Sequence, residues 1–342
     1  GESVLSLVVD AAGGAHAAFS CSGVIRVAES SDAGRTWHVT EVTPPAGEKD
    51  LDPKVAVDAT TLYVGYTRVV PDEGCGSTGS TSVSVAYRSR PLAGGAWASG
   101  HSFGASGDHV DVIVAAGGTL HFAIEDPTRV AYVAIHGGTT QLTTITKEVG
   151  VAAPGLAVAG NGTVHVADQV AKGVGFGTLG TSGFSTVIVP SSDAGWAPLL
   201  AQAAGNAMDL VWVRAPEPGG CATRDSEPRD GIYFGTNAGG TWKVTRVTTD
   251  TGTVALAVAP TSGRAHVLVS GDDPNSCCPM SPGTLTDYVG RGSGPWAKTV
   301  LLPTTVSSSV IGIEPSTGKP IVLYQDEALD GSSFQVLALS GS

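Results

Sequence analysis

Several loop-forming stretches of this chain carry side chains that could act as acids, bases or nucleophiles. His109 lies close to two aspartates in the sequence, and an imidazole near a charged partner is a typical general base. The same histidine could equally be a solvated loop residue, which is the commoner situation. We therefore assign no catalytic residue, and the catalytic candidates are His109, Asp108, Asp111, Glu125 and Tyr324.

A second group of residues has the composition of a sugar-binding site. Sugars are recognised by paired polar contacts and by an aromatic side chain that offers a flat surface. Carboxylates also suit Ca²⁺, so calcium is the one cofactor that we keep open, and no metal site is assigned. The candidate ligand-binding residues are Asp52, Lys54, Tyr66, Glu125, Arg129, Trp196, Arg214, Tyr324 and Asp326.

The elements that must position these residues are expected to be β strands. Val, Thr, Ala and Gly dominate the 342 residues, and no sustained apolar pattern predicts a long amphipathic helix. The net charge is −12, without a block of Lys or Arg, which argues against nucleic acid or an anionic membrane as a partner. Because no apolar run is long enough for a transmembrane helix, we expect an all-β protein that does not insert into membranes.

Seven segments share one outline, in which an apolar run, a tight polar turn and a second alternating run predict a β-hairpin. Their second strands align in a column whose members are 44 to 58 residues apart. Repeats of that length, with about four short strands each, predict the blades of a β-propeller. The aligned column is His16, Tyr63, His121, His165, Leu210, His266 and Ile321.

The prediction is therefore one domain over residues 1–342, a seven-bladed β-propeller whose blades are mostly four-stranded and antiparallel. Only three strands are apparent in the last unit, so the last blade is allowed three. The expected blades cover residues 1–50, 51–107, 108–150, 151–195, 196–251, 252–305 and 306–342. The recurrent histidines are expected to be structural, because unrelated blades would not each need a ligand at one position.

The repeat register also places polar residues at one end of the blades. The connections between blades, and those joining second to third strands, should emerge at this end, which we call the loop face. The opposite end, which we call the turn face, should carry the remaining tight turns. A polar column is expected at the loop-face end of the second strands, and it comprises Ser20, Thr67, Glu125, Gln169, Arg214, Ser270 and Gln325.

The stretch S-S-D-A-G-R-T-W, residues 30–37, resembles the Asp-box of sialidase-like (BNR-repeat) propellers at Ser30, Asp32, Gly34 and Trp37. A degenerate copy, G-T-N-A-G-G-T-W, ends at Trp242. The resemblance implies that the box holds the turn between a third and a fourth strand, that its Trp packs between blades, and that ligands bind at the opposite face. The R-I-P motif of the sialidases is missing here, so the resemblance transfers no catalytic residue.

The cysteines Cys21, Cys75, Cys221, Cys277 and Cys278 all fall in connections between second and third strands. Disulfides would order these long, weakly apolar connections and would indicate an oxidising compartment. Neighbouring blades suggest pairing of Cys21 with Cys75 and of Cys221 with Cys277 or Cys278. A bond between Cys277 and Cys278 is the competing arrangement, and a soft copper site that also uses Met280 is a further alternative.

These observations predict a secreted or cell-surface protein, with any signal peptide removed, that acts as a monomer. Its expected function is to bind a ligand, most plausibly a glycan or another cell-surface ligand, at the loop face. One alternative is an enzyme at that face, either a sialidase-like glycoside hydrolase or a polysaccharide lyase. A protein-interaction scaffold is the second alternative, since a fold does not by itself determine function.

Overall fold

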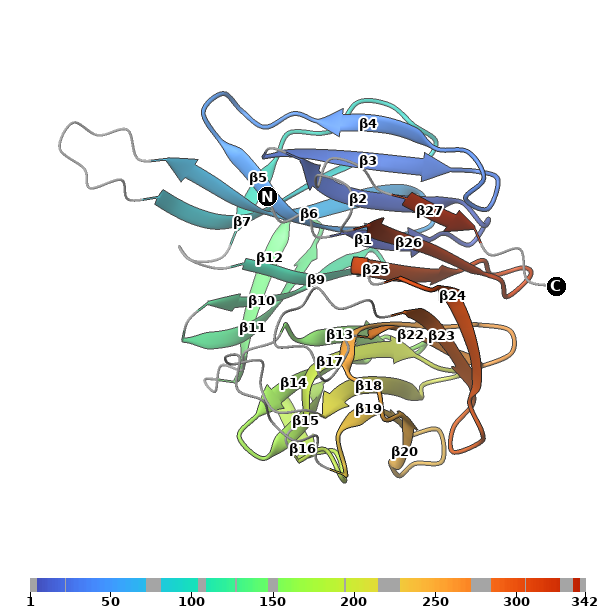
Figure 1. Ribbon diagram of the computed structural model, residues 1–342. Helices are drawn as coiled ribbons and strands as arrows, with labels where there is room; N and C mark the ends of the chain where they lie inside the picture. Colours follow the sequence, from blue (N-terminus) through green and yellow to red (C-terminus); the bar gives the residue numbers. More distant parts are fainter. Residues whose placement is uncertain are drawn as a thin grey trace. The chain divides into compact units, whose positions relative to one another are not determined.

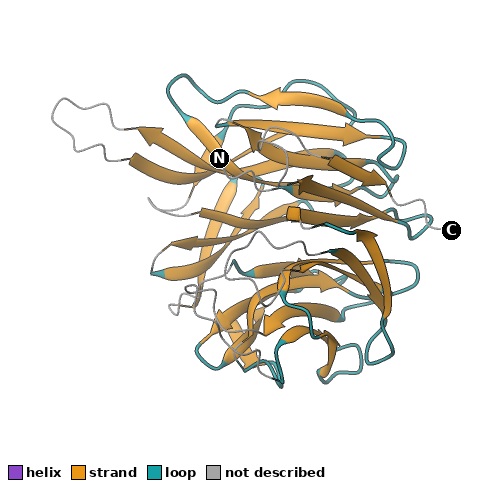
Figure 2. Cartoon of the chain, viewed as in Figure 1, coloured by secondary structure: helices purple, strands orange, loops and turns teal. Residues whose placement is uncertain are grey.

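The structure is a computed structural model that describes residues 5–21, 23–71, 81–103, 109–126, 128–146, 153–193, 195–214, 228–271, 284–304, 306–326 and 335–338. All regular elements in these ranges are β strands (Figure 2). The chain divides into two compact units, Gly1–Val149 and Gly150–Ser342. In both units, consecutive strands pair antiparallel to form small sheets, which we call blades where they have four strands.

The first unit contains blades 1 to 3 (Figure 1). Blade 1 consists of β1 (Ser6–Val9), β2 (Ala15–Cys21), β3 (Val24–Ser30) and β4 (His38–Val42). Blade 2 consists of β5 (Lys49–Val57), β6 (Thr61–Pro71), β7 (Thr81–Pro91) and β8 (His101–Phe103). Blade 3 consists of β9 (His109–Ala116), β10 (Thr119–Asp126), β11 (Arg129–His136) and β12 (Thr139–Thr146).

The second unit contains blades 4 to 6 and a C-terminal sheet. Blade 4 consists of β13 (Gly155–Val158), β14 (Val164–Val170), β15 (Gly173–Gly180) and β16 (Gly183–Ile188). Blade 5 consists of β17 (Gly195–Gln202), β18 (Met208–Arg214), β19 (Gly231–Thr236) and β20 (Lys243–Thr248). Blade 6 consists of β21 (Gly252–Val258), β22 (Ala265–Gly271), β23 (Leu285–Gly290) and β24 (Ala297–Leu302), and the C-terminal sheet consists of β25 (Val306–Ile313), β26 (Pro320–Asp326) and β27 (Gln335–Ala338).

The expected number of seven blades is corrected by this topology. The structure has six four-stranded blades, and the segment expected to form a seventh is a sheet of three strands, β25, β26 and β27. Within the described ranges no fourth strand pairs with this sheet, and β1 pairs with β2 of blade 1. The all-β class and the antiparallel, mainly four-stranded blades are confirmed.

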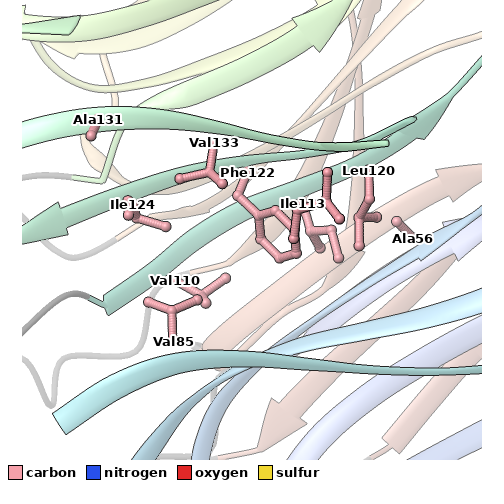
Figure 3. Packing of buried hydrophobic residues seen from close by; sticks show 10 residues of the cluster. Ala56, Val85, Val110, Ile113, Leu120, Phe122, Ile124, Ala131 and Val133 are labelled. Carbon is pink, nitrogen blue, oxygen red and sulfur yellow. The ribbon is translucent and has the colours of Figure 1, made fainter. Parts of the chain in front are cut away.

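Apolar side chains from neighbouring blades fill the seams between them. Figure 3 shows the cluster between blades 2 and 3, which surrounds the Phe122 ring. Gly65 on β6 lies so close to this ring that an added Cβ would come within 2.9 Å of it. In the second unit, Trp242 of blade 5 stands edge-on to Phe176 of blade 4 with ring centroids 5.0 Å apart. Trp242 therefore packs between blades, whereas the Nε1–H of Trp37, the residue for which this packing was expected, donates to the Gly34 carbonyl of its own turn at 2.9 Å.

The turn between β3 and β4 is held by the side chain of Asp32. Its Oδ1 accepts hydrogen bonds from the backbone N–H groups of Arg35 and Thr36, at 3.0 and 2.9 Å, and its Oδ2 accepts one from the Thr36 hydroxyl at 2.6 Å. The Ser30 hydroxyl donates to Asp32 Oδ1 and accepts from the Gly34 N–H, both at 2.8 Å. The residues expected to hold this turn do so.

The degenerate copy uses its polar residue differently. Asn237 Oδ1 accepts a hydrogen bond from the N–H of Met208 at 2.7 Å, so this side chain joins the turn to the second strand of its own blade. Asp10, Asp58 and Glu314 hold turns between first and second strands through bonds to nearby N–H groups. Short polar side chains that bond the backbone of their own turn are common, but the sequence analysis had not identified these three.

Each recurrent histidine is buried and bonded to a polar residue of its own blade. His121 Nδ1 lies 2.7 Å from the Tyr132 hydroxyl, His165 Nδ1 lies 3.1 Å from the Thr178 hydroxyl, and His266 Nδ1 lies 2.9 Å from Asp287 Oδ2. These distances place the histidines in hydrogen bonds across the sheet, which is a structural role.

His16 has the most charged surroundings of these histidines. Its ring nitrogens lie 3.0 Å from Asp10 and 3.2 Å from Glu29, and Glu29 also pairs with Arg90 of blade 2. Burial lowers the pKa of His16, but the hydrogen bonds with Glu29 and Asp10 outweigh this and raise the pKa above its ordinary value. The group therefore links blades 1 and 2 through a histidine that favours its protonated form.

We expect Asp32→Ala to lower the urea concentration at which the protein unfolds, because several turn N–H groups and hydroxyls lose their acceptor. Asp32→Asn, which keeps one acceptor oxygen, should have a smaller effect. Equilibrium urea unfolding followed by circular dichroism measures both variants. Equal midpoints for wild type and Asp32→Ala would show that the turn does not need this side chain.

We expect His16→Gln to destabilise the protein more at pH 5.5 than at pH 8.5. A raised histidine pKa contributes stability that is present below the unfolded value and lost as the pH rises through the folded value. The loss at acid pH should be about 1–3 kcal/mol, typical of a buried hydrogen bond to a charged group. Urea unfolding at the two pH values tests this, with the exposed His38→Gln as the control; an equal loss at both pH values would contradict it.

Candidate functional site

Irregularities of strand pairing are concentrated at the loop face of both units. Seven strand pairs show a shift in register, and every shift lies toward the end where the connections between blades emerge. Such bulges bend a strand and redirect its side chains, and they are over-represented next to active sites. The regular pairing continues toward the turn face, so the backbone is specialised at the loop face.

Four of these shifts affect the first strand of a sheet. The residues left out of the pairing are Asp52 and Pro53 in β5, Asp111 in β9, Ala197 and Pro198 in β17, and Ser307 in β25. Asp52 and Ala197 also have left-handed backbone angles, with φ of 50° and 49°. Non-glycine residues adopt this conformation at an energetic cost, and such strain is enriched at functional sites, although it also occurs in structural turns such as that of Ala33.

Three of the expected site residues, Asp52, Lys54 and Asp111, interact electrostatically at the bulge in β5. Lys54 follows the bulge directly and pairs with Gly65 of β6. Ala56, two residues further along the strand, belongs to the apolar cluster of Figure 3, so Lys54 lies on the same side of the strand, where that cluster ends toward the loop face. Burial lowers the pKa of the Lys54 amine, while the charges of Asp111 and Asp52 act in the opposite direction.

Two more expected site residues lie at the loop face of blade 3. Glu125 is near the end of β10 and pairs with His109 of β9, and Arg129 begins β11. Both side chains are half-buried. The first unit therefore holds Asp52, Lys54, Asp111, Glu125 and Arg129 at one end of two adjacent blades.

The two expected tyrosines need a correction. The Tyr66 side chain is fully buried in the cluster between blades 1 and 2, and Tyr324 is 7% exposed within the cluster of blade 6 and the C-terminal sheet. Their rings are covered by apolar neighbours, so neither can offer a surface to a sugar. The sequence places both tyrosines on strands that flank the loop face, but it could not show which neighbouring blade covers them.

Arg214 and Trp196 hold the second unit together at its loop face. Arg214 is 7% exposed and donates to the Asp193 carbonyl at 2.9 Å and to Asp193 Oδ2 at 2.8 Å. These bonds join blade 5 to the connection from blade 4 and occupy the Nε donor and one Nη2 donor of the guanidinium. Trp196, beside the bulge in β17, is half-buried against the cluster between blades 5 and 6.

Part of the polar column joins adjacent sheets. The Thr67 hydroxyl accepts a hydrogen bond from the Val110 N–H at 3.3 Å, and the Ser270 hydroxyl donates to the Val306 carbonyl at 2.8 Å. Both bonds reach the first strand of the next sheet. Hydrogen bonds between sheets therefore explain why these two positions of the column are polar.

The remaining predictions fall partly outside the described residues. Asp108, Cys75, Cys221, Cys277 and Cys278 lie there, so the disulfide arrangements stay predictions. For His109 and Asp326 the structure describes the backbone alone. Over the described ranges, no group of three or more His, Cys, Asp or Glu side chains is arranged to hold a metal ion. None of the described segments forms a helix that is long and apolar enough to cross a membrane.

Comparison with known proteins supports the fold. No family model and no curated protein sequence matches the chain. Among solved structures, it is similar to a Trypanosoma rangeli sialidase bound to 2,3-difluorosialic acid, with a TM-score of 0.53, 11% identity, and coverage of 79% of this chain and 52% of the sialidase. The NanB sialidase of Streptococcus pneumoniae gives a TM-score of 0.54 at 10% identity, covering 97% of this chain and 66% of NanB.

A third similar structure is the WD40 propeller domain of Doa1, with a TM-score of 0.56, 12% identity, and coverage of 94% of this chain and 89% of that domain. The chain spans about half the length of the trypanosome sialidases it matches. Sialidases and a WD40 domain match this chain with similar TM-scores and at similarly low identity. The similarity therefore shows a shared fold and nothing more. The chain has a β-propeller fold of the kind that sialidases also use.

Proposed function

We propose that this propeller binds a glycan at the loop face of its first unit. The observation that carries the proposal is the bulge in β5, where left-handed Asp52 and the adjacent Lys54 share an electrostatic environment with Asp111. A strained, bulged strand is retained where it serves to aim side chains. Here the redirected side chains are an amine and two carboxylates.

This set of groups suits the hydroxyl and carboxylate groups of sugars. The carboxylates of Asp52 and Asp111 can accept hydrogen bonds from sugar hydroxyls, and the Lys54 amine can donate to hydroxyls or to an acidic group. Glu125 and Arg129 on the neighbouring blade extend the polar surface. A charge-assisted hydrogen bond is stronger than a neutral one, so we expect Lys54 to contribute most to affinity for an acidic sugar.

Binding without turnover is the function that we favour. One of the catalytic candidates, Tyr324, is buried in the cluster of blade 6 and the C-terminal sheet and is therefore out of reach of a substrate. A sialidase-like hydrolase is the second candidate, supported by the similarity of the fold to the trypanosome and pneumococcal enzymes. We also propose that the protein works as a monomer outside the cell or on its surface.

A glycan array that includes neutral and acidic sugars, combined with titration of the best ligand, tests the binding proposal. We expect Lys54→Met to weaken binding at least tenfold, because about 1.5–3 kcal/mol is lost with a hydrogen bond to a charged group. Lys243→Met, at an exposed position on β20, is the matched control and should bind as the wild type does.

Two results would overturn the proposal. Unchanged affinity in Lys54→Met, with the variant folded, would remove the β5 bulge from the site. Turnover of sialosides or acidic polysaccharides by the wild type would replace the binder with the enzyme.

A further inference from the structure

Asp50 is a fully buried carboxyl group in the seam between blades 1 and 2. It lies near the start of β5, and its side chain has no exposed surface. Its N–H donates to the Gly23 carbonyl of blade 1 at 3.0 Å, which holds this part of β5 against the turn between β2 and β3. Neither carboxylate oxygen has a hydrogen-bond partner among the described residues.

Two arginines lie close to Asp50, but both are engaged elsewhere. The Arg68 Nε atom is 2.8 Å from Glu48 Oε2, and Arg68 Nη1 donates to the Ser102 hydroxyl at 3.2 Å. Arg88 Nε donates to the Tyr66 hydroxyl at 3.3 Å. Arg68, Arg88 and Tyr66 converge beneath Gly100, where a built Cβ would lie 2.9 to 3.6 Å from their polar atoms.

The arrangement provides Asp50 with an alternative partner. Asp50 and Arg68 are directly opposite each other in the pairing of β5 with β6, so their side chains leave the sheet on the same side. The contact between Arg68 Nε and Glu48 Oε2 is close but lacks the alignment of a hydrogen bond. Rotation of the Arg68 side chain from Glu48 toward Asp50 would give the Asp50 carboxylate a charged partner.

We propose that Asp50 is a proton-operated switch in the seam between blades 1 and 2: protonated Asp50 leaves Arg68 with Glu48, and ionised Asp50 takes Arg68 over. The reason is that an ionised carboxylate cannot stay buried without a partner, whereas a neutral carboxyl group can. Proton loss from Asp50 therefore forces either this exchange or a local opening of the seam.

The balance of charges places the switch near neutral pH. Burial raises the pKa of Asp50 to about 6; the positive charges of Arg88 and Arg68 oppose the increase, and Glu48 adds to it. The same seam also contains the Tyr66 hydroxyl on β6, the Lys49 side chain, whose stem lies against Gly23, and the charged group of Asp10, His16, Glu29 and Arg90. Because the folded pKa is raised, the stability provided by protonated Asp50 is complete below about pH 4 and is lost as the pH rises through 6.

We expect a change in the protonation of Asp50 to affect the loop face as well. Asp50 is two residues before Asp52, whose left-handed bulge precedes Lys54. This last consequence rests on the proposed function, whereas the exchange of Arg68 does not. The glycan-binding proposal and the Asp50 switch are therefore tested by different measurements. A failure to detect glycan binding would not count against the switch.

Titration of the isotope-labelled protein by nuclear magnetic resonance tests the switch. One aspartate carboxyl signal should titrate near pH 6 and should disappear in Asp50→Asn, and the Arg68 Nε signal should shift with the same midpoint. In hydrogen exchange corrected for the intrinsic rate, opening of β5 should increase by up to about 100-fold between pH 4 and pH 8, since each unit of pKa shift is a factor of ten. In Asp50→Asn this increase should vanish.

A second pair of variants keeps the proposal testable if Asp50→Asn does not fold. Glu48→Gln removes the competing partner of Arg68, so the midpoint of Asp50 should move down toward its ordinary value. Glu41→Gln, which alters an exposed glutamate paired with Arg26 on blade 1, should leave the midpoint unchanged. A wild-type Asp50 midpoint near 4, or an Arg68 Nε signal that does not respond between pH 5 and pH 7, would overturn the proposal.

Discussion

Each blade of this protein is a small twisted sheet with two faces that need cover, and the packing of one blade against the next provides that cover. A single hairpin or a small isolated sheet is only marginally stable in water. Phe122 illustrates the solution, because its ring is fully buried between blades 2 and 3 (Figure 3). The close approach at Gly65 and the rings of Trp97, Trp242 and Trp296 contribute to these contacts between blades.

Hydrogen bonds and ion pairs inside the seams determine how each sheet is aligned against the next. Apolar contacts alone allow neighbouring sheets to slide, whereas a buried hydrogen bond is satisfied in one arrangement only. Thr67 bonded to Val110 and Ser270 bonded to Val306 link one sheet to the first strand of the next. The ion pair of Glu29 with Arg90 does the same for blades 1 and 2. Asp50 differs from all of these, because its buried carboxyl group has no hydrogen-bond partner among the residues that the structure describes.

The acidic character of the chain has more than one physical origin. Asp10, Asp32, Asp58 and Glu314 hold turns through hydrogen bonds to backbone N–H groups. Asp52 and Asp111 instead lie at bulges of first strands, where their charges act on the half-buried Lys54. A net charge of −12 is thus partly a consequence of turn construction, and the carboxylates available for a ligand are a small subset at the loop face.

From the sequence alone it was possible to predict the strand segments, the turn held by Asp32 and the assignment of residues to the two faces. These properties depend on alternation, turn residues and repeat spacing, which are local, and the hydrogen bonds of Asp32 follow from them. The burial of Tyr66 and Tyr324 in the core and the bonds of Arg214 to Asp193 became clear only from the tertiary structure. It also decided the bulges at Asp52 and Asp111 and the burial of Asp50, because these depend on residues that neighbouring sheets bring from dozens of positions away.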